Sequence, residues 1–364
     1  MKLFDKTWKL ALSGVVIGLL VMLLAMSGNP ANMAICVACF IRDAAGALKL
    51  HTAAPVQYFR PEIVGFVCGS FLISMATKEY RSTAGSAPMV RFLLGAVMMI
   101  GALVFLGCPL RMVLRMSAGD LNAYVALIGF AGGVATGSCF LKKGFSLGRA
   151  YETNSLSGAV LPVLLAALLV IGVATGAYAA STEGPGSKHA PLLLALVVAL
   201  VIGALAQKSR MCFAGSIRDV ILMKNFDLLS IIAALFAVMT IYNIATGNFH
   251  LSFSGQPIAH SQHLWNILGM YVVGFAAVLA GGCPLRQLIL AGQGSSDSAV
   301  TVVGMFVGSA ICHNFGLAAS GTALNPETKE VVAGAVPVNG KVACIICIVI
   351  CFIIAFTNKR EEAK

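Results

Sequence analysis

The stretch Gly107–Arg111 reads Gly-Cys-Pro-Leu-Arg, and the same five residues return at Gly282–Arg286. A second motif, a cysteine followed after five residues by Arg-Asp, begins at Cys36 and again at Cys212. The copies of the first motif are 175 residues apart (283 − 108), and those of the second are 176 apart (212 − 36). Two matches at almost one spacing indicate an internal duplication, in which each unit carries two matched cysteines.

The composition places the chain in a lipid bilayer. Of its 364 residues, 59% are hydrophobic and 11% are charged, and the mean hydropathy is +0.90. A soluble protein has about 25% charged residues, so this chain has too much apolar surface for water. The net charge of +11 has two explanations. An excess of Lys and Arg in cytoplasmic loops is the commoner one, and attraction of an anion is the other.

Ten apolar runs are long enough, or nearly so, to cross a bilayer as helices. They lie near 10–27, 61–77, 90–107, 121–141, 155–180, 190–206, 227–247, 264–282, 298–320 and 342–357. Four shorter segments begin at Cys36, Cys108, Cys212 and Cys283, and they are too short and too charged to cross. Irregular backbone at membrane depth is tolerated where protein or a water-filled cavity covers it, so these segments are predicted to be re-entrant half-helices.

The positions of Lys and Arg predict the topology. With the N-terminus inside, and leaving out the half-helices, the inner loops hold 14 of these side chains. The outer loops hold five: Lys49, Arg60, Lys188, Lys329 and Lys341. Positive charge favours the cytoplasmic side, so both termini are expected there.

The duplication predicts an inverted repeat, because an odd number of crossings separates the two units. We expect a single membrane domain with a first repeat at 10–150, a linking helix and outer linker at 151–189, a second repeat at 190–320, and an outer loop with a C-terminal helix at 321–364. Inverted repeats bring broken helices together near the midplane. Cys36 and Cys108 should therefore approach from outside, and Cys212 and Cys283 from inside.

The repeated motif suits a small anion that contains a soft atom such as sulfur. Proline favours the first turn of a helix, so Pro109 and Pro284 predict helix starts with the preceding cysteines at the N-cap. A helix N-terminus offers free N–H groups and partial positive charge, and Arg111 and Arg286 add charge nearby. The alternative is that Gly-Cys-Pro packs where helices cross and the arginine points to headgroups. Duplication of both the cysteine and the arginine makes this alternative weaker.

Other residues are expected to have supporting roles. Arg42-Asp43 and Arg218-Asp219 are interpreted as structural pairs that cap the half-helices or link parts of the fold, with direct substrate contact as the less favoured alternative. Cys39 forms a Cys-x-x-Cys pair with Cys36 and has Gly215 as its counterpart in the second unit. The cysteines of the last span are expected to pack as small apolar residues: Cys344, Cys347 and Cys351.

Several features are expected to be absent or inert. No P-loop motif occurs, which excludes ATP hydrolysis of that kind. The spans are expected to lack Asp and Glu, which argues against an intramembrane carboxylate relay. His313 is placed in a span as a packing residue, and the remaining histidines are expected to be solvated in outer loops: His51, His189, His250, His260 and His263.

The two Gly-Cys-Pro-Leu-Arg copies, Cys36 with Arg42-Asp43, and the stretch Lys208–Gly215 resemble the YeeE/YedE family of bacterial inner-membrane proteins. The resemblance covers essentially the whole chain and looks closer to the YedE branch, which is associated with selenium. It implies thiosulfate uptake through a narrow hourglass-shaped path, in which cysteines pass the ion along by S–H···S contacts. Those cysteines would be Cys36, Cys108 and Cys283, and Cys212 joins them by internal symmetry.

We therefore predict an all-α transporter, not an enzyme, that imports a small sulfur- or selenium-containing anion without a cofactor or bound metal. A cytoplasmic sulfur- or selenium-acceptor protein is a candidate partner, and nucleic acid is not. One alternative is a membrane thiol oxidoreductase or sulfur transferase that uses Cys36 and Cys39. Another is a soft-metal importer, although an arginine beside each cysteine opposes passage of a cation.

Overall fold

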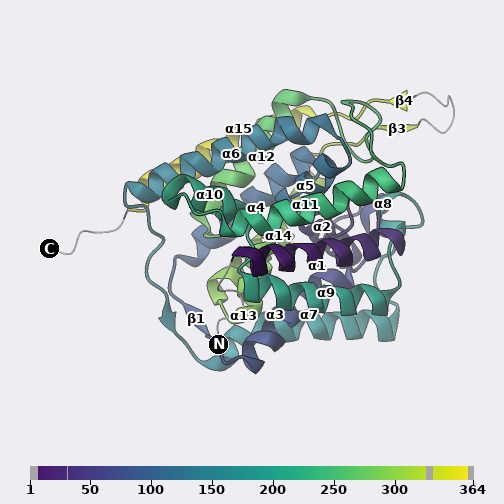
Figure 1. The fold of residues 1–364 in the computed structure, drawn as a ribbon. Coiled ribbons are helices and arrows are strands. Elements are labelled where there is room, and N and C mark those ends of the chain that lie inside the picture. Colours follow the sequence, from purple (N-terminus) through teal and green to yellow (C-terminus); the bar gives the residue numbers. More distant parts are fainter. Residues whose placement is uncertain (1–6, 31, 325–330, 360–364) are drawn as a thin grey trace.

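The computed structural model describes residues 7–30, 32–324 and 331–359, and within these ranges the chain is almost entirely helical. Ten long helices cross the molecule from one end to the other (Figure 1). They are α1 (Thr7–Met26), α3 (Pro61–Ala76), α4 (Pro88–Phe105), α6 (Leu121–Lys142), α7 (Ser155–Thr175), α9 (Leu192–Ser209), α11 (Asp227–Ala245), α12 (His263–Leu279), α14 (Ser296–Asn314) and α15 (Val338–Thr357).

The remaining elements are short. Four half-helices lie among the long helices: α2 (Val37–Ala47), α5 (Pro109–Ser117), α10 (Phe213–Met223) and α13 (Pro284–Gln293). Two single turns are η1 (Ala54–Val56) and α8 (Gly184–Ser187). Two antiparallel two-residue ladders pair β1 (Thr83–Ala84) with β2 (Tyr151–Glu152) and β3 (Ala323–Leu324) with β4 (Val331–Val332).

The predicted all-α membrane fold is confirmed. Within the described residues, nine helical segments are long and apolar enough to span a bilayer. The tenth long helix, α14, lies where a span was predicted but is not among these nine. The expectation that the spans lack acidic residues was wrong, because the predicted spans 61–77 and 227–247 contain Glu62 and Asp227, in the first turns of α3 and α11. Glu62 is fully buried.

Each half-helix begins where the motifs predict. Cys36, Cys108, Cys212 and Cys283 are the N-cap residues of α2, α5, α10 and α13. Proline opens α5 and α13, where its missing N–H costs no hydrogen bond. The helix before α5 ends at Leu106 in the left-handed region (φ 65°), and the helix before α10 ends in the same way at Arg210 (φ 56°). The chain therefore changes direction just before the cysteine.

Close packing between long helices follows the same order in both halves. Helix α6 packs against α12, and α14 packs against α4. In α6, a Cβ on Gly129 or Gly133 would lie 2.0–2.1 Å from a backbone oxygen of α12. In α14, Gly304 and Gly308 make similar approaches to α4, and they lie 175 residues after the α6 pair (304 − 129; 308 − 133). Small residues let helix backbones approach in a membrane, so the duplicated spacing extends to the packing. The inverted orientation and the repeat boundaries stay predictions.

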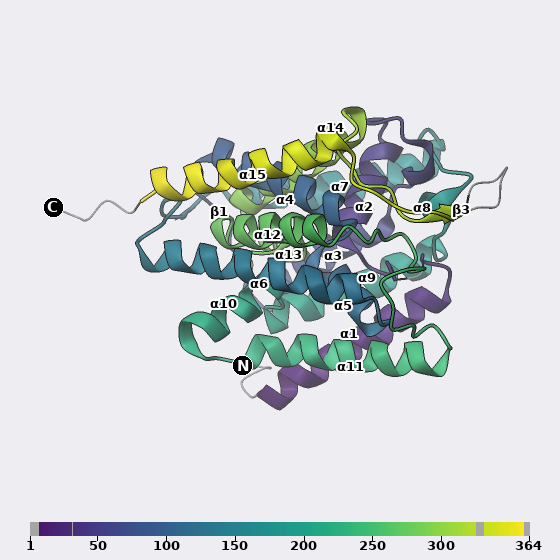
Figure 2. The same ribbon diagram turned by 90° about the horizontal axis from the view of Figure 1, so that it is seen from above.

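The loops gather at two opposite ends of the helices. At one end β1 pairs with β2, Thr83 pairs with Ser295, and Phe145 pairs with Lys359. At the other end lie α8 and the β3–β4 ladder (Figures 1 and 2). The half-helices α2 and α5 lie toward the α8 end, and α10 and α13 lie toward the β1 end (Figure 2). The two pairs of half-helices therefore enter the molecule from opposite ends.

Candidate functional site

The tips of α2 and α5 bring together Cys36, Cys39 and Cys108, which we call the outer cysteine group after the side from which they are predicted to approach. The Cys36 thiol donates to the Cys108 sulfur at 3.8 Å, and the Cys39 backbone N–H donates to the Cys36 sulfur at 3.4 Å. The backbone N–H groups of Arg111 and Ala38 also donate to the Cys108 sulfur. Sulfur atoms thus sit where N–H donors of two helix N-termini converge, a setting that suits an anion.

The inner cysteine group consists of Cys212 and Cys283, at the tips of α10 and α13. Their thiols hydrogen-bond to each other. The backbone N–H of Gly215 donates to the Cys212 sulfur at 3.2 Å, as that of Cys39 does to Cys36. The N–H groups of Arg286 and Phe213 donate to the Cys283 sulfur, in the pattern seen at Cys108. The structure therefore pairs the four matched cysteines two by two.

Both cysteine groups are closed off from solvent. Cys36, Cys108 and Cys283 are at most 1% exposed, and Cys212 is 7% exposed. The half-helices of the two groups contact each other, since α2 packs against α13 and α5 packs against α10. An ion that moved between the groups would need the surrounding segments to shift.

The glycine of the repeated motif makes room for its arginine. A Cβ added at Gly107 would lie 2.8 Å from Cδ of Arg111, and one added at Gly282 would lie 2.8 Å from Cγ of Arg286. In both copies the arginine side chain folds back over the glycine toward the helix tip. The spacing of Gly and Arg in the motif therefore has a steric reason, which is independent of the cysteine.

The two arginines of the motif have different surroundings. Arg111 is fully buried and donates to the carbonyls of Asn32 at 3.0 Å, Ile258 at 3.1 Å and Leu106. It also contacts the Cys39 sulfur at 3.6 Å. These bonds tie α5 to the segments that cover the outer cysteine group.

Arg286 is half-buried, and its guanidinium donates to the Gln207 side-chain oxygen at 3.4 Å. More of its donor capacity remains for a ligand. Gln207 was missed from the sequence because nothing connects it to the motif before the chain is folded.

The two Arg-Asp pairs also differ in burial: the pair in α2 is buried, and the pair in α10 is partly exposed. Asp43 binds Arg42 at 2.7 Å and Arg60 at 2.8 Å, and all three side chains are buried. Arg60 also donates to the carbonyls of two residues near α8, Pro185 and Lys188, so this cluster holds the outer linker. The pair Arg218–Asp219 is joined at 2.8 Å with side chains 31% and 15% exposed. Arg60 was counted from the sequence only as an outer-loop charge. Its position directly before Pro61 at the start of α3 was the available signal.

Two of the outer-loop histidines are not solvated. His51 and His260 are each 1% exposed, whereas His189, His250 and His263 are exposed as expected. The ring of His51 lies 3.0 Å from the Arg42 carbonyl, and that of His260 lies 2.8 Å from the Val104 carbonyl. Burial lowers the pKa of both rings, to about 4 for His260. The prediction of solvation was wrong for these two residues, because a loop position alone does not determine whether a ring reaches a buried carbonyl.

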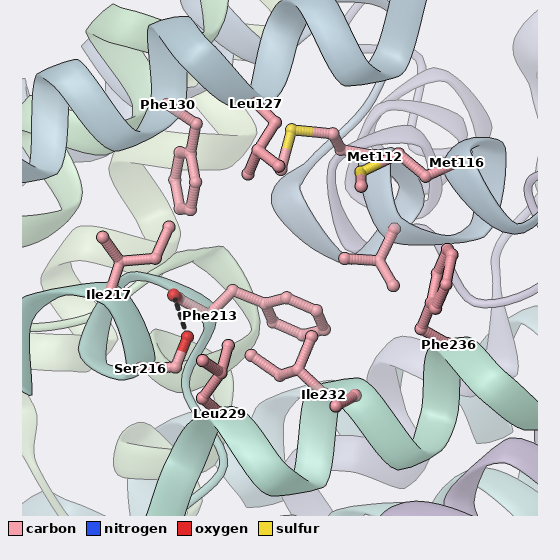
Figure 3. A pocket seen from close by; sticks show the side chains of 12 residues that line it. Met112, Met116, Leu127, Phe130, Phe213, Ser216, Ile217, Leu229, Ile232 and Phe236 are labelled. Carbon is pink, nitrogen blue, oxygen red and sulfur yellow. Dashed lines mark hydrogen bonds between the residues drawn. The ribbon is translucent and has the colours of Figure 1, made fainter. Parts of the chain in front are cut away.

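An apolar cavity of about 170 Å³ lies beside the half-helix α10 (Figure 3). Phe213, which follows Cys212, points into it toward Ile232 of α11, and Met112 and Met116 of α5 face them (Figure 3). The lining carries no charged side chain, so this cavity does not suit an anion. In the other half, α7 packs against α3 and α13, so an extra helix covers the corresponding place.

The C-terminal cysteines lie apart from the two cysteine groups. Cys344, Cys347 and Cys351 are buried along α15 and take part in no hydrogen-bonded thiol pair that resembles Cys36–Cys108 among the described residues. Across the described ranges, no group of three or more His, Cys, Asp or Glu side chains is placed to hold a metal ion.

Comparison with known proteins links the second half of the chain to transport. Residues 208–364 match the profile of a family described as sulphur transport. The matched region contains the inner cysteine group and Arg286, and it leaves out the outer group. A search of curated proteins finds no significant match. Together with the apolar helices, the family match supports a multi-pass membrane protein that transports a sulfur species. It does not separate the YedE-like branch from the rest of the family.

Proposed function

We propose that the chain imports a small sulfur- or selenium-containing oxyanion, of which thiosulfate is the simplest example, into the bacterial cytoplasm. The observation that supports this proposal most is the pairing of Cys36 with Cys108 and of Cys212 with Cys283, each at two helix N-termini. An oxyanion would take its hydrogen bonds from the N–H groups of the helix tips, and its sulfur would contact the thiols.

The electrostatic setting favours an anion over a cation. The first turns of α5 and α13 each carry an arginine, and no acidic side chain lies in either first turn. A Cu(I) ion would find thiols here, but it would also meet this positive charge. Arg286 supplies a partly free guanidinium at the inner group, where the ion would leave toward the cytoplasm.

The path would open one side at a time. In the structure, which is closed on this side, Arg111 and the segment before Cys36 cover the outer group. The inner group is less covered, because Cys212 and Arg286 retain some exposure. A cytoplasmic acceptor protein would collect the ion from this side.

The competing function is a thiol enzyme that uses Cys36 and Cys39 as a redox pair. Disulfide exchange needs a resolving thiol, whereas passing an ion needs one sulfur at each position. In right-side-out membrane vesicles or proteoliposomes, uptake of radiolabelled thiosulfate should survive Cys39→Ala and be lost in Cys36→Ala. The matched position in the second unit is Gly215, which already lacks a thiol.

Equal loss of activity in Cys36→Ala and Cys39→Ala would contradict the transport proposal and support the redox enzyme. Absence of uptake by the wild-type protein, with membrane levels normal, would also contradict it. A parallel assay with Cu(I) tests the metal alternative, and we expect no copper uptake above that of empty vesicles.

A further inference from the structure

Glu62 has surroundings unlike those of the other buried acids. It is fully buried in the first turn of α3, and its Oε1 accepts a hydrogen bond from the Asn29 side chain at 2.8 Å. Its second oxygen, Oε2, is buried without a hydrogen-bond partner. A negative charge on an oxygen with no donor is costly inside a protein, so the uncharged carboxylic acid fits this place.

Two other acids, Asp43 and Asp120, are also fully buried, but both form ion pairs with arginine. Asp43 pairs with two arginines, and Asp120 pairs with Arg115 at 2.6 Å. Among the described residues, Glu62 is the fully buried acid that has no cation within ion-pair distance.

The charged and titratable groups that influence Glu62 are Arg60, Asp43 and Tyr58. Arg60 directs its donors to Asp43 and to the carbonyls near α8, so it does not neutralise Glu62 directly. Asp43 adds negative charge, which opposes ionisation of Glu62.

Asn29 connects Glu62 to the segment that covers the outer cysteine group. Its side-chain N–H₂ donates both to Glu62 and to the Ala34 carbonyl, the latter at 2.6 Å. Its side-chain oxygen accepts from the Ala190 backbone N–H at 2.8 Å, just before α9. Ala34 lies two residues before Cys36. Asn32, which lies between Asn29 and Ala34, accepts a hydrogen bond from Arg111 through its backbone carbonyl. A change of charge at Glu62 therefore acts on the segment that closes the outer side.

We propose that Glu62 is a proton-binding site that couples proton entry to anion import. A proton on Glu62 allows Asn29 and residues 32–36 to close over the outer cysteine group, so the anion is enclosed together with a proton. An inside-negative membrane potential opposes entry of an anion, and protons that move with the anion offset this opposition. The inference rests on the proposed function and adds its energy coupling.

The test uses purified protein in proteoliposomes with radiolabelled thiosulfate and two assays. The first measures accumulation driven by an inward proton gradient, and the second measures exchange with thiosulfate on both sides at equal pH. For the wild type, a gradient of about one pH unit should raise accumulation about tenfold for each coupled proton. Glu62→Gln keeps the shape of the protonated acid and should retain exchange while losing this response to the gradient. The control Glu79→Gln alters an exposed acid that pairs with Lys208 and should retain both activities.

The outcomes separate three claims: that Glu62 is the proton site, that import is coupled to protons, and that the protein transports thiosulfate. If Glu62→Gln responds to the gradient as the wild type does, Glu62 is not the proton site. If wild-type protein exchanges thiosulfate but a pH-sensitive dye inside the vesicles detects no acidification as thiosulfate enters, proton coupling itself is wrong, whether or not Glu62→Gln folds. If the wild type neither exchanges nor accumulates thiosulfate, the proposed function fails instead.

Discussion

Arg111 and Arg286 occupy the same place in the repeated motif, but they use their guanidinium groups differently. Arg111 is held by carbonyls from three parts of the chain, whereas Arg286 has one long side-chain contact. The sequence could not distinguish them, because the partners of Arg111 come from distant residues such as Asn32 and Ile258. In two identical motifs, Arg111 therefore stabilises the fold at the outer cysteine group, whereas the Arg286 guanidinium at the inner cysteine group can bind a ligand.

We expect substitutions at these two arginines to have different effects. Arg111→Gln leaves buried carbonyls without donors, at roughly 1–3 kcal/mol each, and should lower the melting temperature and the yield in detergent. Arg286→Gln should leave stability nearly unchanged and reduce thiosulfate uptake, and Arg286→Glu should reduce it further by repelling the anion. Thermal melting and vesicle uptake measured on the same preparations separate the effects. A stable Arg286→Glu protein with normal uptake would contradict an anion path at the inner group.

The cysteines of the repeated motif should each be required. Cys108→Ser and Cys283→Ser replace the soft sulfur with a smaller, harder oxygen at the helix tips, so each should abolish uptake at normal membrane levels. Cys347→Ser is the matched control, because that residue is also buried but lies on α15, outside both groups. Radiolabel uptake, normalised to protein by immunoblot, provides the measurement. Loss of uptake in Cys347→Ser equal to that in the other two would show the path to be wrongly assigned.

At the scale of helices, the packing of α6 on α12 depends on single glycines. A Cβ added at Gly133 would lie 2.1 Å from the Tyr271 carbonyl oxygen. A Cβ added at Gly132 would have its nearest neighbour, a ring atom of Tyr271, at 3.7 Å. Gly133→Ala should force the helices apart and destabilise the protein by about 1–3 kcal/mol. Gly132→Ala should be neutral or stabilising, because alanine favours a helix by about 1 kcal/mol over glycine.

The measurement for this pair is the melting temperature of each variant in the same detergent. The two positions are adjacent in one helix, so differences in membrane insertion are small. Equal melting temperatures for Gly132→Ala and Gly133→Ala would show that this interface is looser than the structure describes.

Much of the helix content could be predicted because each element has a local signal. Apolar runs gave the long helices, and Cys-Pro or Cys-x5-Arg-Asp marked the starts of α5, α13, α2 and α10. The pairing of helices could not be predicted in the same way. It depends on which glycines face another helix, and the repeated Gly-x-x-x-Gly at 129–133 and 304–308 does not specify its partner helix. The orphaned oxygen of Glu62 likewise depends on where Asn29 lies after folding.

At the scale of the whole molecule, the two ends differ in charge. The end with β1 and β2 carries Lys78, Lys142 and Lys143, together with the Lys208–Glu79 pair. The end with α8 carries fewer basic residues, and one of them, Arg60, is buried in an ion pair with Asp43. This difference supports the predicted orientation, in which the β1 end faces the cytoplasm.

Labelling with a membrane-impermeant maleimide tests this orientation. Lys188 and Lys142 are both exposed and lie at opposite ends of the helices, so Lys188→Cys and Lys142→Cys form a matched pair. Cys139 is exposed and lies three residues before Lys142, so both variants should be made in a Cys139→Ser background. The cysteines of the predicted path are buried and should contribute little label. In intact cells the reagent should modify Lys188→Cys and not Lys142→Cys, and in inverted vesicles the pattern should exchange. Modification of Lys142→Cys in intact cells would place the inner cysteine group on the outside, and the direction of import would have to be reversed with it.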